Sequence, residues 1–288
     1  MPRARRGIAR NAPWVAFYGT ADEMGDLARV ATTFRLIVID ADPKIGNFTR
    51  AQIATLHAGG RNTVVSYLDV GSCERARSYF HVAPRGLTPC GANTAAQLGR
   101  YTGYPDEVWM NPANPSYQQL ILEHVAPRLA ATGVDGFFLD NLELLEHGAH
   151  AREAPCDAAC VAGGLALVRA LRQAYPTQVI IMQNATSEVT RTAVVGGVTF
   201  PTLLDGISEE ETYAPVFHRD AEARLRAWQA LGLTIDGHPF SITTEDYVGS
   251  CRNAKAAAAV RARSRARGFS PYVTTASADQ SSICGWSF

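Results

Sequence analysis

The sequence has no long apolar run and no surplus of charge of either sign. It contains no stretch of about 18 consecutive apolar residues, the length that a membrane-spanning helix requires. Lysine and arginine together number 27, as do aspartate and glutamate, so the formal net charge is zero. Proteins that bind nucleic acid usually carry a basic surplus that neutralises phosphates. We therefore expect neither a membrane span nor a nucleic-acid partner.

Motifs that would indicate a metal or a nucleotide cofactor are also missing. The chain has no CxxC or HxxxH spacing and no GxGxxG turn. Among the 7 histidines, only His147 and His150 stand at a spacing that weakly suggests paired ligands. We expect no metal and no cofactor. A zinc site or a metal-dependent hydrolase is the weaker alternative.

The six cysteines are even in number, which is typical of a disulfide-bonded protein in an oxidising compartment. Three short-range pairs would each staple a loop, although six cysteines allow many other pairings. These pairs are Cys73–Cys90, Cys156–Cys160 and Cys251–Cys284. The sequence therefore predicts a secreted or cell-surface protein, with reduced, buried cysteines in a cytosolic protein as the alternative.

Eight short apolar runs alternate with amphipathic stretches along the chain. The runs cover residues 14–19, 35–41, 63–71, 134–140, 178–184, 203–210, 233–242 and 269–275, and the seventh is interrupted by Gly237 and Pro239. Continuous apolar runs are typical of parallel strands that are buried on both faces. The clearest expected helices cover residues 49–58, 116–132, 158–175, 220–231 and 254–267.

This alternation predicts an α/β fold, a single (β/α)8 TIM barrel, with a long insertion between the third and fourth strands. A barrel of this kind typically needs about 250 residues. We expect residues 1–12 to form an N-terminal tail and residues 13–288 to form the barrel domain. An open doubly wound sheet is the alternative, weakened by the missing glycine-rich turn.

The insertion, residues 73–114, is rich in aromatic residues, including Tyr101, Tyr104 and Trp109. A long loop in a compact domain is usually functional. At the carboxyl end of the barrel it would form one wall of a cleft, where aromatic rings suit sugar stacking. A loop that packs only on its own aromatic residues is the alternative.

Polar residues follow many of the expected strands. They are Asp40 and Asp42, Tyr67, Asp69 and Glu74, Asp140, Asn141 and Glu143, Gln183 and Asn184, and Glu209, Glu210, Glu211 and Tyr213. The carboxyl ends of barrel strands line the active site, so this set indicates a catalytic face. Single aspartates there could instead cap helices. Carboxyl groups on strands four and six could flank a scissile glycosidic bond at the separation that retaining or inverting enzymes need.

Three segments resemble glycoside hydrolase family 114, the endo-α-1,4-polygalactosaminidases, and its bacterial barrel relatives. They are VVSYLDVGSCERARSYF (64–80), GVDGFFLDNLELLE (133–146) and LLDGISEEETY (203–213). The most specific part is the GxDGxxxDN pattern of strand four, and the similarity extends over most of the chain.

The resemblance implies that Asp140 is the strand-four catalytic carboxylate, which we take as the nucleophile. It places the acid/base within the triplet that ends strand six, where Glu210 aligns best. A one-residue shift in register would move that role to Glu209 or Glu211. The expected substrate-binding residues are Asp40, Tyr67, Asp69, Glu74, Trp109, Asn141, Glu209 and Tyr213.

The implied partner is a polysaccharide, most simply an α-1,4-linked galactosamine polymer cleaved internally by a monomeric enzyme. The free amines of such a polymer make it cationic, so an acidic cleft would attract it. A hydrolase of a different polysaccharide and a secreted, non-catalytic carbohydrate-binding barrel are the alternatives.

Overall fold

The computed structural model describes residues 7–9, 11–275 and 280–285. Its main sheet has eight parallel strands, and their spatial order follows the order of the chain. The strands are β1 (Trp14–Phe17), β2 (Leu36–Ile39), β3 (Thr63–Asp69), β7 (Gly136–Asp140), β8 (Val179–Gln183), β11 (Gly206–Glu210), β14 (Ser241–Tyr247) and β15 (Ser270–Thr274). Nearly all of their residues are buried, as strands covered on both faces require.

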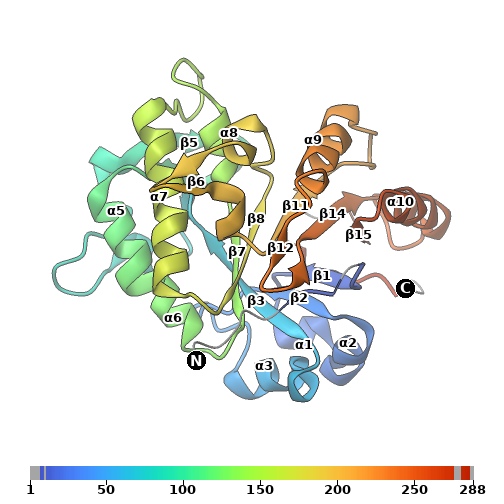
Figure 1. Ribbon diagram of the computed structural model, residues 1–288. Helices are drawn as coiled ribbons and strands as arrows, with labels where there is room; N and C mark the ends of the chain where they lie inside the picture. Colours follow the sequence, from blue (N-terminus) through green and yellow to red (C-terminus); the bar gives the residue numbers. More distant parts are fainter. Residues whose placement is uncertain (1–6, 10, 276–279, 286–288) are drawn as a thin grey trace.

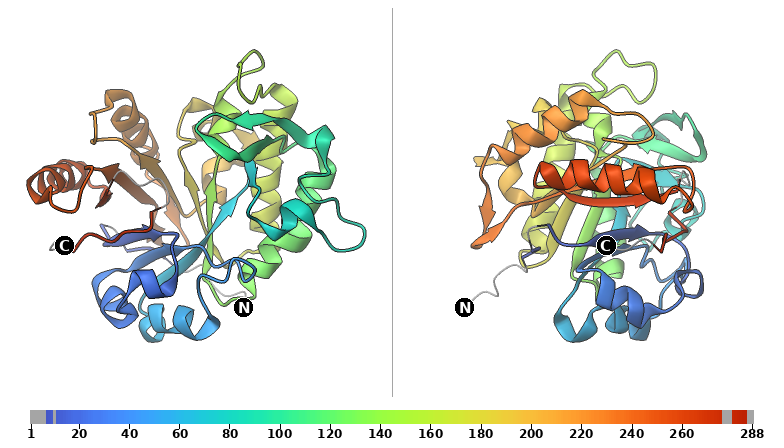
Figure 2. Two further views of the ribbon diagram at one scale, coloured as in Figure 1. Left: turned by 180° about the vertical axis from the view of Figure 1, so that it is seen from behind. Right: turned by 90° about the vertical axis from the view of Figure 1, so that its right-hand side faces the viewer.

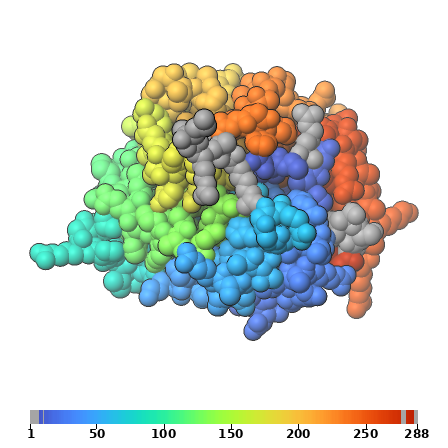
Figure 3. Space-filling view, turned by 60° about the horizontal axis from the view of Figure 1, so that its bottom comes forward, coloured from blue at the N-terminus to red at the C-terminus, as the bar shows by residue number. Residues whose placement is uncertain are grey.

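The sheet curls into a nearly closed barrel, because the last strand, β15, lies beside β1. Trp14 Nε1 on β1 donates to the carbonyl oxygen of Ser270 on β15 at 2.8 Å. The (β/α)8 TIM barrel predicted from the sequence is confirmed. In the space-filling view the colours succeed one another around the molecule, from blue through green and yellow to red (Figure 3).

Helices surround the sheet, with α1–α3, α5–α7 and α9–α10 gathered on three sides of it (Figures 1 and 2). Their bounds are α1 (Ala21–Met24), α2 (Leu27–Thr33), α3 (Arg50–Leu56), α4 (Ser78–His81), α5 (Pro115–Leu120), α6 (Ala126–Ala130), α7 (Ala158–Ala174), α8 (Glu188–Arg191), α9 (Arg219–Gln229) and α10 (Ala254–Ala266). A π turn (Ile121–Val125) joins α5 to α6, and short 3₁₀ segments cover Ala58–Gly60, Thr94–Ala96, Leu142–Glu146 and Phe200–Leu203. Within the described residues, no helix is both long enough and apolar enough to span a membrane.

The insertion after β3 carries a three-stranded antiparallel sheet. Its strands are β4 (Ser72–Glu74), β5 (Gln97–Tyr101) and β6 (Tyr104–Met110), and β6 lies between the other two. The Cys73–Cys90 disulfide closes this segment. The other two expected pairs, Cys156–Cys160 and Cys251–Cys284, are also formed, so all three predicted disulfides are confirmed.

The expected position of the seventh strand was wrong. Residues 234–239 form a small hairpin, β12 (Thr234–Ile235) and β13 (His238–Pro239), which turns at Asp236 and Gly237 with positive φ angles. An Asp-Gly pair is typical of such two-residue turns. The barrel strand is β14, which runs on into Glu245, Asp246 and Tyr247. Because these residues are polar, the sequence pattern did not indicate that this strand is fully buried.

A second small hairpin pairs β9 (Val194–Val195) with β10 (Val198–Thr199).

Two Asp-Gly pairs fix the register of the strands that carry the catalytic candidates. Asp135 Oδ2 accepts from the backbone N–H of Val64 at 2.9 Å, and a Cβ on Gly136 would lie 1.9 Å from the oxygen of Val179. Asp205 Oδ2 likewise accepts from a backbone N–H of the neighbouring strand β8 at 2.8 Å. At the start of each strand, the backbone of the aspartate also forms hydrogen bonds with both neighbouring strands.

Candidate active site

A cavity of about 460 Å³ lies at the carboxyl ends of the barrel strands. Its walls come from six of the eight strands or the residues just after them, from the insertion, and from the segment that follows β15. The lining residues are Tyr18, Asp40, Ile45, Asn47, Tyr67, Glu74, Ala76, Arg77, Tyr101, Tyr104, Glu107, Asp140, Asn141, Glu143, Gln183, Asn184, Glu210 and Gln280. This is the face at which barrel enzymes place their catalytic groups.

Glu210 is the only member of the strand-six triplet that lines this cavity. Its Oε2 accepts from Asn184 Nδ2 at 2.6 Å, and its Oε1 accepts from the hydroxyl of Tyr247. The neighbouring Glu209 does not line this cavity; its carboxylate accepts from the hydroxyl of Thr186 and pairs with Arg224 on α9. Strand alternation thus separates the two side chains.

Asp140 ends β7, two strands away from Glu210 in the sheet order. Burial raises the pKa of Asp140 well above its ordinary value, and the carboxyls of Glu143, Glu210 and Asp69 add to the rise. The backbone N–H of Asn141 acts in the opposite direction. Asp140 therefore holds its proton more tightly than an exposed aspartate.

Three non-glycine residues with left-handed backbone conformation flank the two carboxyls. Asn141 (φ 61°) follows Asp140, Glu211 (φ 53°) follows Glu210, and Asn184 (φ 61°) follows β8. Asparagine tolerates this region better than most residues. The left-handed turn at Asn184 ends β8, and the side chain of Asn184 keeps its hydrogen bond to Glu210. Such local strain is concentrated at functional sites.

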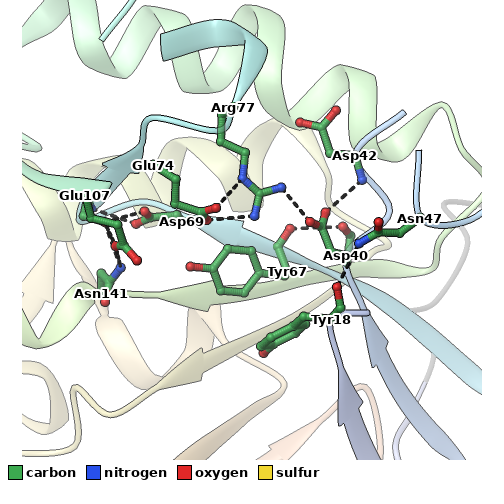
Figure 4. Close-up of polar contacts among 12 residues, drawn as sticks. Tyr18, Asp40, Asp42, Asn47, Tyr67, Asp69, Glu74, Arg77, Glu107 and Asn141 are labelled. Carbon is green, nitrogen blue, oxygen red and sulfur yellow. Dashed lines mark hydrogen bonds and ion pairs between the residues drawn. The ribbon is translucent and has the colours of Figure 1, made fainter. Parts of the chain in front are cut away.

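Arg77 crosses one wall of the cavity and links two carboxylates. Its Nη1 lies 2.7 Å from Asp40 Oδ2, and its Nη2 lies 2.7 Å from Glu74 Oε1 (Figure 4). The guanidinium also lies over the ring of Tyr67, 5.4 Å from its centroid. Burial raises the pKa of Asp40, and Arg77 counteracts that rise.

A serine hydroxyl joins two further acidic groups. Ser72 Oγ lies 2.5 Å from Asp69 Oδ2 and 2.6 Å from Glu107 Oε2, and Asn141 Nδ2 donates to it at 3.0 Å. A hydroxyl has one hydrogen, so the second short contact needs a proton on one of the carboxyls. Burial, with mutual repulsion among the acidic groups, raises the pKa of Asp69 to about 6 and that of Glu107 to about 8.

The insertion supplies the aromatic wall. Tyr101 and Tyr104 line the cavity, whereas Trp109 is buried behind them and stacks on Tyr101 with centroids 4.1 Å apart. Trp109 Nε1 donates to Glu153 at 2.8 Å. Trp109 thus supports the wall instead of facing the cavity. Tyr213 is also buried and stacks on Phe217 outside the cavity lining.

A second hollow, of about 610 Å³, extends the cavity beyond Glu210. It shares Tyr104, Glu143, Asn184 and Glu210 with the first and adds Glu146, Glu209, Glu211, Pro215, Arg224, Tyr247 and Gly249. Together the two hollows form a groove, which passes over the candidate acid/base residue. A linear polymer needs such an extended site on both sides of the bond that is cut.

The groove is strongly acidic. Among the residues that the structure describes, nine carboxyl side chains line it, and the two arginines that line it, Arg77 and Arg224, are both paired with carboxylates of the same groove. The nine are Asp40, Glu74, Glu107, Asp140, Glu143, Glu146, Glu209, Glu210 and Glu211. Among the described residues, no group of three or more His, Cys, Asp or Glu side chains is arranged to hold a metal ion.

The structure brings most, but not all, of the residues expected from the sequence to the groove. Asp40, Tyr67, Glu74, Asp140, Asn141, Glu209 and Glu210 line it, while Asp69, Trp109 and Tyr213 are buried and do not line it. Sequence reasoning missed Tyr18, Arg77, Glu107, Tyr247 and Gln280. Arg77 stands within the family-like segment 64–80, which was a usable signal. Gln280 lies far from any motif and carried none.

Comparison with known proteins identifies the class. Residues 9–224, three quarters of the chain, match the model of glycoside-hydrolase family GH114. The chain belongs to this family and is a glycosidase.

Two solved structures share the fold over nearly the whole chain. One is the glycoside hydrolase domain of PelA from Pseudomonas aeruginosa, with 20% identity and a TM-score of 0.69, covering 93% of this chain and 96% of that one. The other is Ega3 from Aspergillus fumigatus in complex with galactosamine, with 14% identity and a TM-score of 0.68, covering 99% and 97%. No curated protein matches the chain.

Proposed function

We propose that the protein is an endo-acting glycosidase that cleaves α-1,4-linked galactosamine polymers, with residues 13–288 as its catalytic domain. The observation that carries the proposal is the acidic groove: nine carboxyls and two paired arginines line it, in a chain whose formal net charge is zero. Such a groove favours a cationic chain, and the free amines of polygalactosamine provide that charge. The relative Ega3 has been solved with galactosamine, which supports this choice of sugar.

In this proposal Asp140 is the nucleophile and Glu210 the acid/base. Asp140 attacks the anomeric carbon, the glycosidic C–O bond breaks, and the leaving oxygen takes the proton of Glu210. Water then attacks the same carbon, Glu210 takes its proton, and Asp140 is released as a carboxylate. Glu210 suits both halves, because Asn184 and Tyr247 stabilise it whenever it is ionised.

The ammonium groups of a bound substrate would also prepare Asp140 for attack. Burial and neighbouring carboxyls of the protein favour its protonated form. Positive charge placed beside a carboxyl lowers its pKa. A cationic sugar therefore favours the ionised nucleophile, and a neutral sugar does not.

The three disulfides support action outside the cytoplasm, where such bonds form and persist. We propose a secreted or cell-surface location on these grounds.

The test is release of oligosaccharides from partly deacetylated galactosaminogalactan, followed by mass spectrometry. Wild type should release galactosamine oligomers, and Asp140→Asn and Glu210→Gln should each lower the rate at least about 10³-fold. Glu211→Gln is the matched control, because Glu211 lines only the second hollow and should keep most of the activity.

Each departure from this pattern has a defined meaning. Activity that survives in Glu210→Gln would refute its role as acid/base. Binding of the polymer by wild type without any release would refute the enzyme proposal and favour a carbohydrate-binding protein.

A further inference from the structure

The carboxyl-terminal segment delivers one side chain to the active site. Gln280 is 3% exposed and lines the cavity of about 460 Å³, although it comes after the last barrel strand. Its carbonyl oxygen accepts from the backbone N–H of Tyr18, which follows β1, at 3.2 Å. The segment therefore lies across the place where the first and last strands of the barrel meet.

The side-chain amide of Gln280 contacts the catalytic candidates directly. Its Nε2 donates to the hydroxyl oxygen of Tyr247 at 2.7 Å and lies 3.4 Å from Glu210 Oε1. An amide N–H can only donate, so the oxygen of Tyr247 is the acceptor in the first contact. The phenol hydrogen of Tyr247 is then left for Glu210, to which it donates.

Tyr247 is well suited to remain a donor. Burial raises its pKa far above the ordinary value, and the carboxyls of Glu245 and Glu210 raise it further. The three residues thus form a one-way chain of hydrogen bonds from Gln280 through Tyr247 to Glu210.

A disulfide holds the segment in place. Cys284 is bonded to Cys251, which stands in the loop between β14 and α10. Two hydrogen bonds to the carbonyl oxygen of Ser282 reinforce this attachment, from Thr274 Oγ1 at 2.8 Å and from the hydroxyl of Tyr272 at 3.4 Å. Gln280 lies four residues before the disulfide, so the bond limits how far it can move from the groove.

We propose that Gln280 is a positioning residue, which directs the hydroxyl of Tyr247 onto Glu210 and is held in the site by the Cys251–Cys284 disulfide. This inference rests on the proposed role of Glu210 as acid/base. It assigns to the end of the chain a part in setting the acid strength of that residue.

The consequence is a specific change in the pH profile. Without Gln280, the Tyr247 hydroxyl loses its fixed direction, and the hydrogen bond that stabilises the Glu210 carboxylate weakens. The basic limb of kcat/KM, where the acid loses its proton, should move upward in pH while kcat falls about tenfold. Within the described part of the chain, the other ionisable groups that face Glu210 are Asp140, Glu143, Glu245, Tyr247, Tyr104 and Tyr18.

The experiment compares Gln280→Met, which keeps the length of the side chain but has no amide, with wild type. Tyr247→Phe and the double variant complete a double-mutant cycle. If Gln280 acts through Tyr247, the double variant should have nearly the same kcat and pH profile as Tyr247→Phe alone. Gln229→Met is the matched control, because the Gln229 amide bonds the oxygen of Arg267 away from the groove. Replacing both Cys251 and Cys284 by serine should move the basic limb in the same direction.

A second readout does not depend on hydrolysis. The Glu210 carboxyl can be titrated by ¹³C NMR and assigned as the resonance that Glu210→Gln removes. An upward shift of its midpoint in Gln280→Met supports the inference even if the chosen polymer is not cleaved. Missing cleavage would count only against the proposed substrate. An unchanged midpoint in a folded Gln280→Met protein would overturn the inference. So would a double variant in which the effects of Gln280→Met and Tyr247→Phe simply add.

Discussion

The two carboxyls at the centre of the groove differ in their surroundings more than in their chemistry. Asp140 is surrounded by other acidic groups, and burial further favours its protonated form. Glu210 instead receives hydrogen bonds from Asn184 and Tyr247. In a two-carboxylate site the acid usually holds its proton more tightly than the nucleophile, so the proposed roles require the ammonium groups of the substrate to lower the pKa of Asp140.

The acidic limb of activity should therefore belong to Asp140. A nucleophile must be ionised, so kcat should fall as the pH drops through the pKa of Asp140 in the substrate complex, which the groove raises and the ammonium groups lower. Burial is the main cause of the rise, and Glu143 is the largest charge contribution. Glu143→Gln should consequently move the acidic limb to lower pH.

A pH–rate profile of each variant checks this expectation. Glu123→Gln, a change on an exposed part of the π turn, is the control and should leave the limb in place. An acidic limb that does not move in Glu143→Gln would contradict the role given to Asp140.

Glu245 should make stability depend on pH. It is fully buried on β14, and desolvation, together with the charge of Glu210, raises its pKa well above the ordinary value. The folded protein then keeps a proton that the unfolded chain loses. Between these two pKa values the free energy of unfolding should fall by up to about 1.4 kcal/mol for each unit of rising pH.

Glu245→Gln removes this proton and its pH dependence. Urea unfolding from pH 5 to pH 8 should show the variant gaining stability relative to wild type as the pH rises. Parallel stability curves for the two proteins would show that Glu245 is not held protonated.

At the scale of elements, the Asp-Gly pairs determine where the catalytic carboxyls fall. Asp140 comes five residues after Asp135, and Glu210 comes five residues after Asp205. Each of the earlier aspartates bonds a backbone N–H of the neighbouring strand, so the register of both strands is fixed from their entry. A shift of one residue would turn Glu210 away from the groove.

Gly136→Ala should disrupt this arrangement. The added Cβ would lie 1.9 Å from the backbone oxygen of Val179, which cannot move without breaking the pairing of β7 with β8. We expect a loss of about 3 kcal/mol or more in the free energy of unfolding, measured by urea denaturation. Gly285→Ala, where the new methyl group would meet nothing within 4 Å, should be near neutral. Equal stability of the two variants would contradict the account.

The aromatic wall from the insertion should act on binding more than on chemistry. Tyr101 presents its ring to the cavity and is supported from behind by Trp109. Tyr101→Ala should raise KM about tenfold, equivalent to ~1.4 kcal/mol, with a smaller change in kcat. Tyr101→Phe keeps the ring and should retain a KM near that of wild type. Steady-state kinetics on a galactosamine oligomer distinguish the two, and an unchanged KM in Tyr101→Ala would remove this wall from the binding site.

The sequence predicted seven of the eight barrel strands well, because buried parallel strands leave continuous apolar runs. It failed at β14, where Thr243, Thr244, Glu245 and Asp246 are polar but fully buried. The family-like motifs led to Asp140 and Glu210. They did not indicate that Trp109 is turned away from the cavity, or that Gln280 returns to it. Those placements depend on packing between distant segments, which local patterns do not encode.

At the scale of the whole molecule, charge is unevenly distributed. The formal net charge is zero, yet nine carboxyls line one groove. Steering of a polycation toward such a groove weakens as salt screens it, over about 10 Å at 0.1 M.

The rate on a cationic polymer should therefore depend on salt. Raising sodium chloride from about 0.02 M to 0.5 M should lower kcat/KM on polygalactosamine about tenfold or more, mainly through KM. Any cleavage of an N-acetylated polymer, which is neutral, should change little. An equal salt effect on both polymers would show that charge does not select the substrate.

The central claim is tested most directly by comparing initial rates on two defined α-1,4-linked oligomers of equal length, one of galactosamine and one fully N-acetylated. The account predicts internal cleavage of the galactosamine oligomer at a kcat/KM at least about 100-fold higher, with the products followed by mass spectrometry. Equal rates on both oligomers, or cleavage of the acetylated one alone, would contradict the claim that the acidic groove selects a cationic amino sugar.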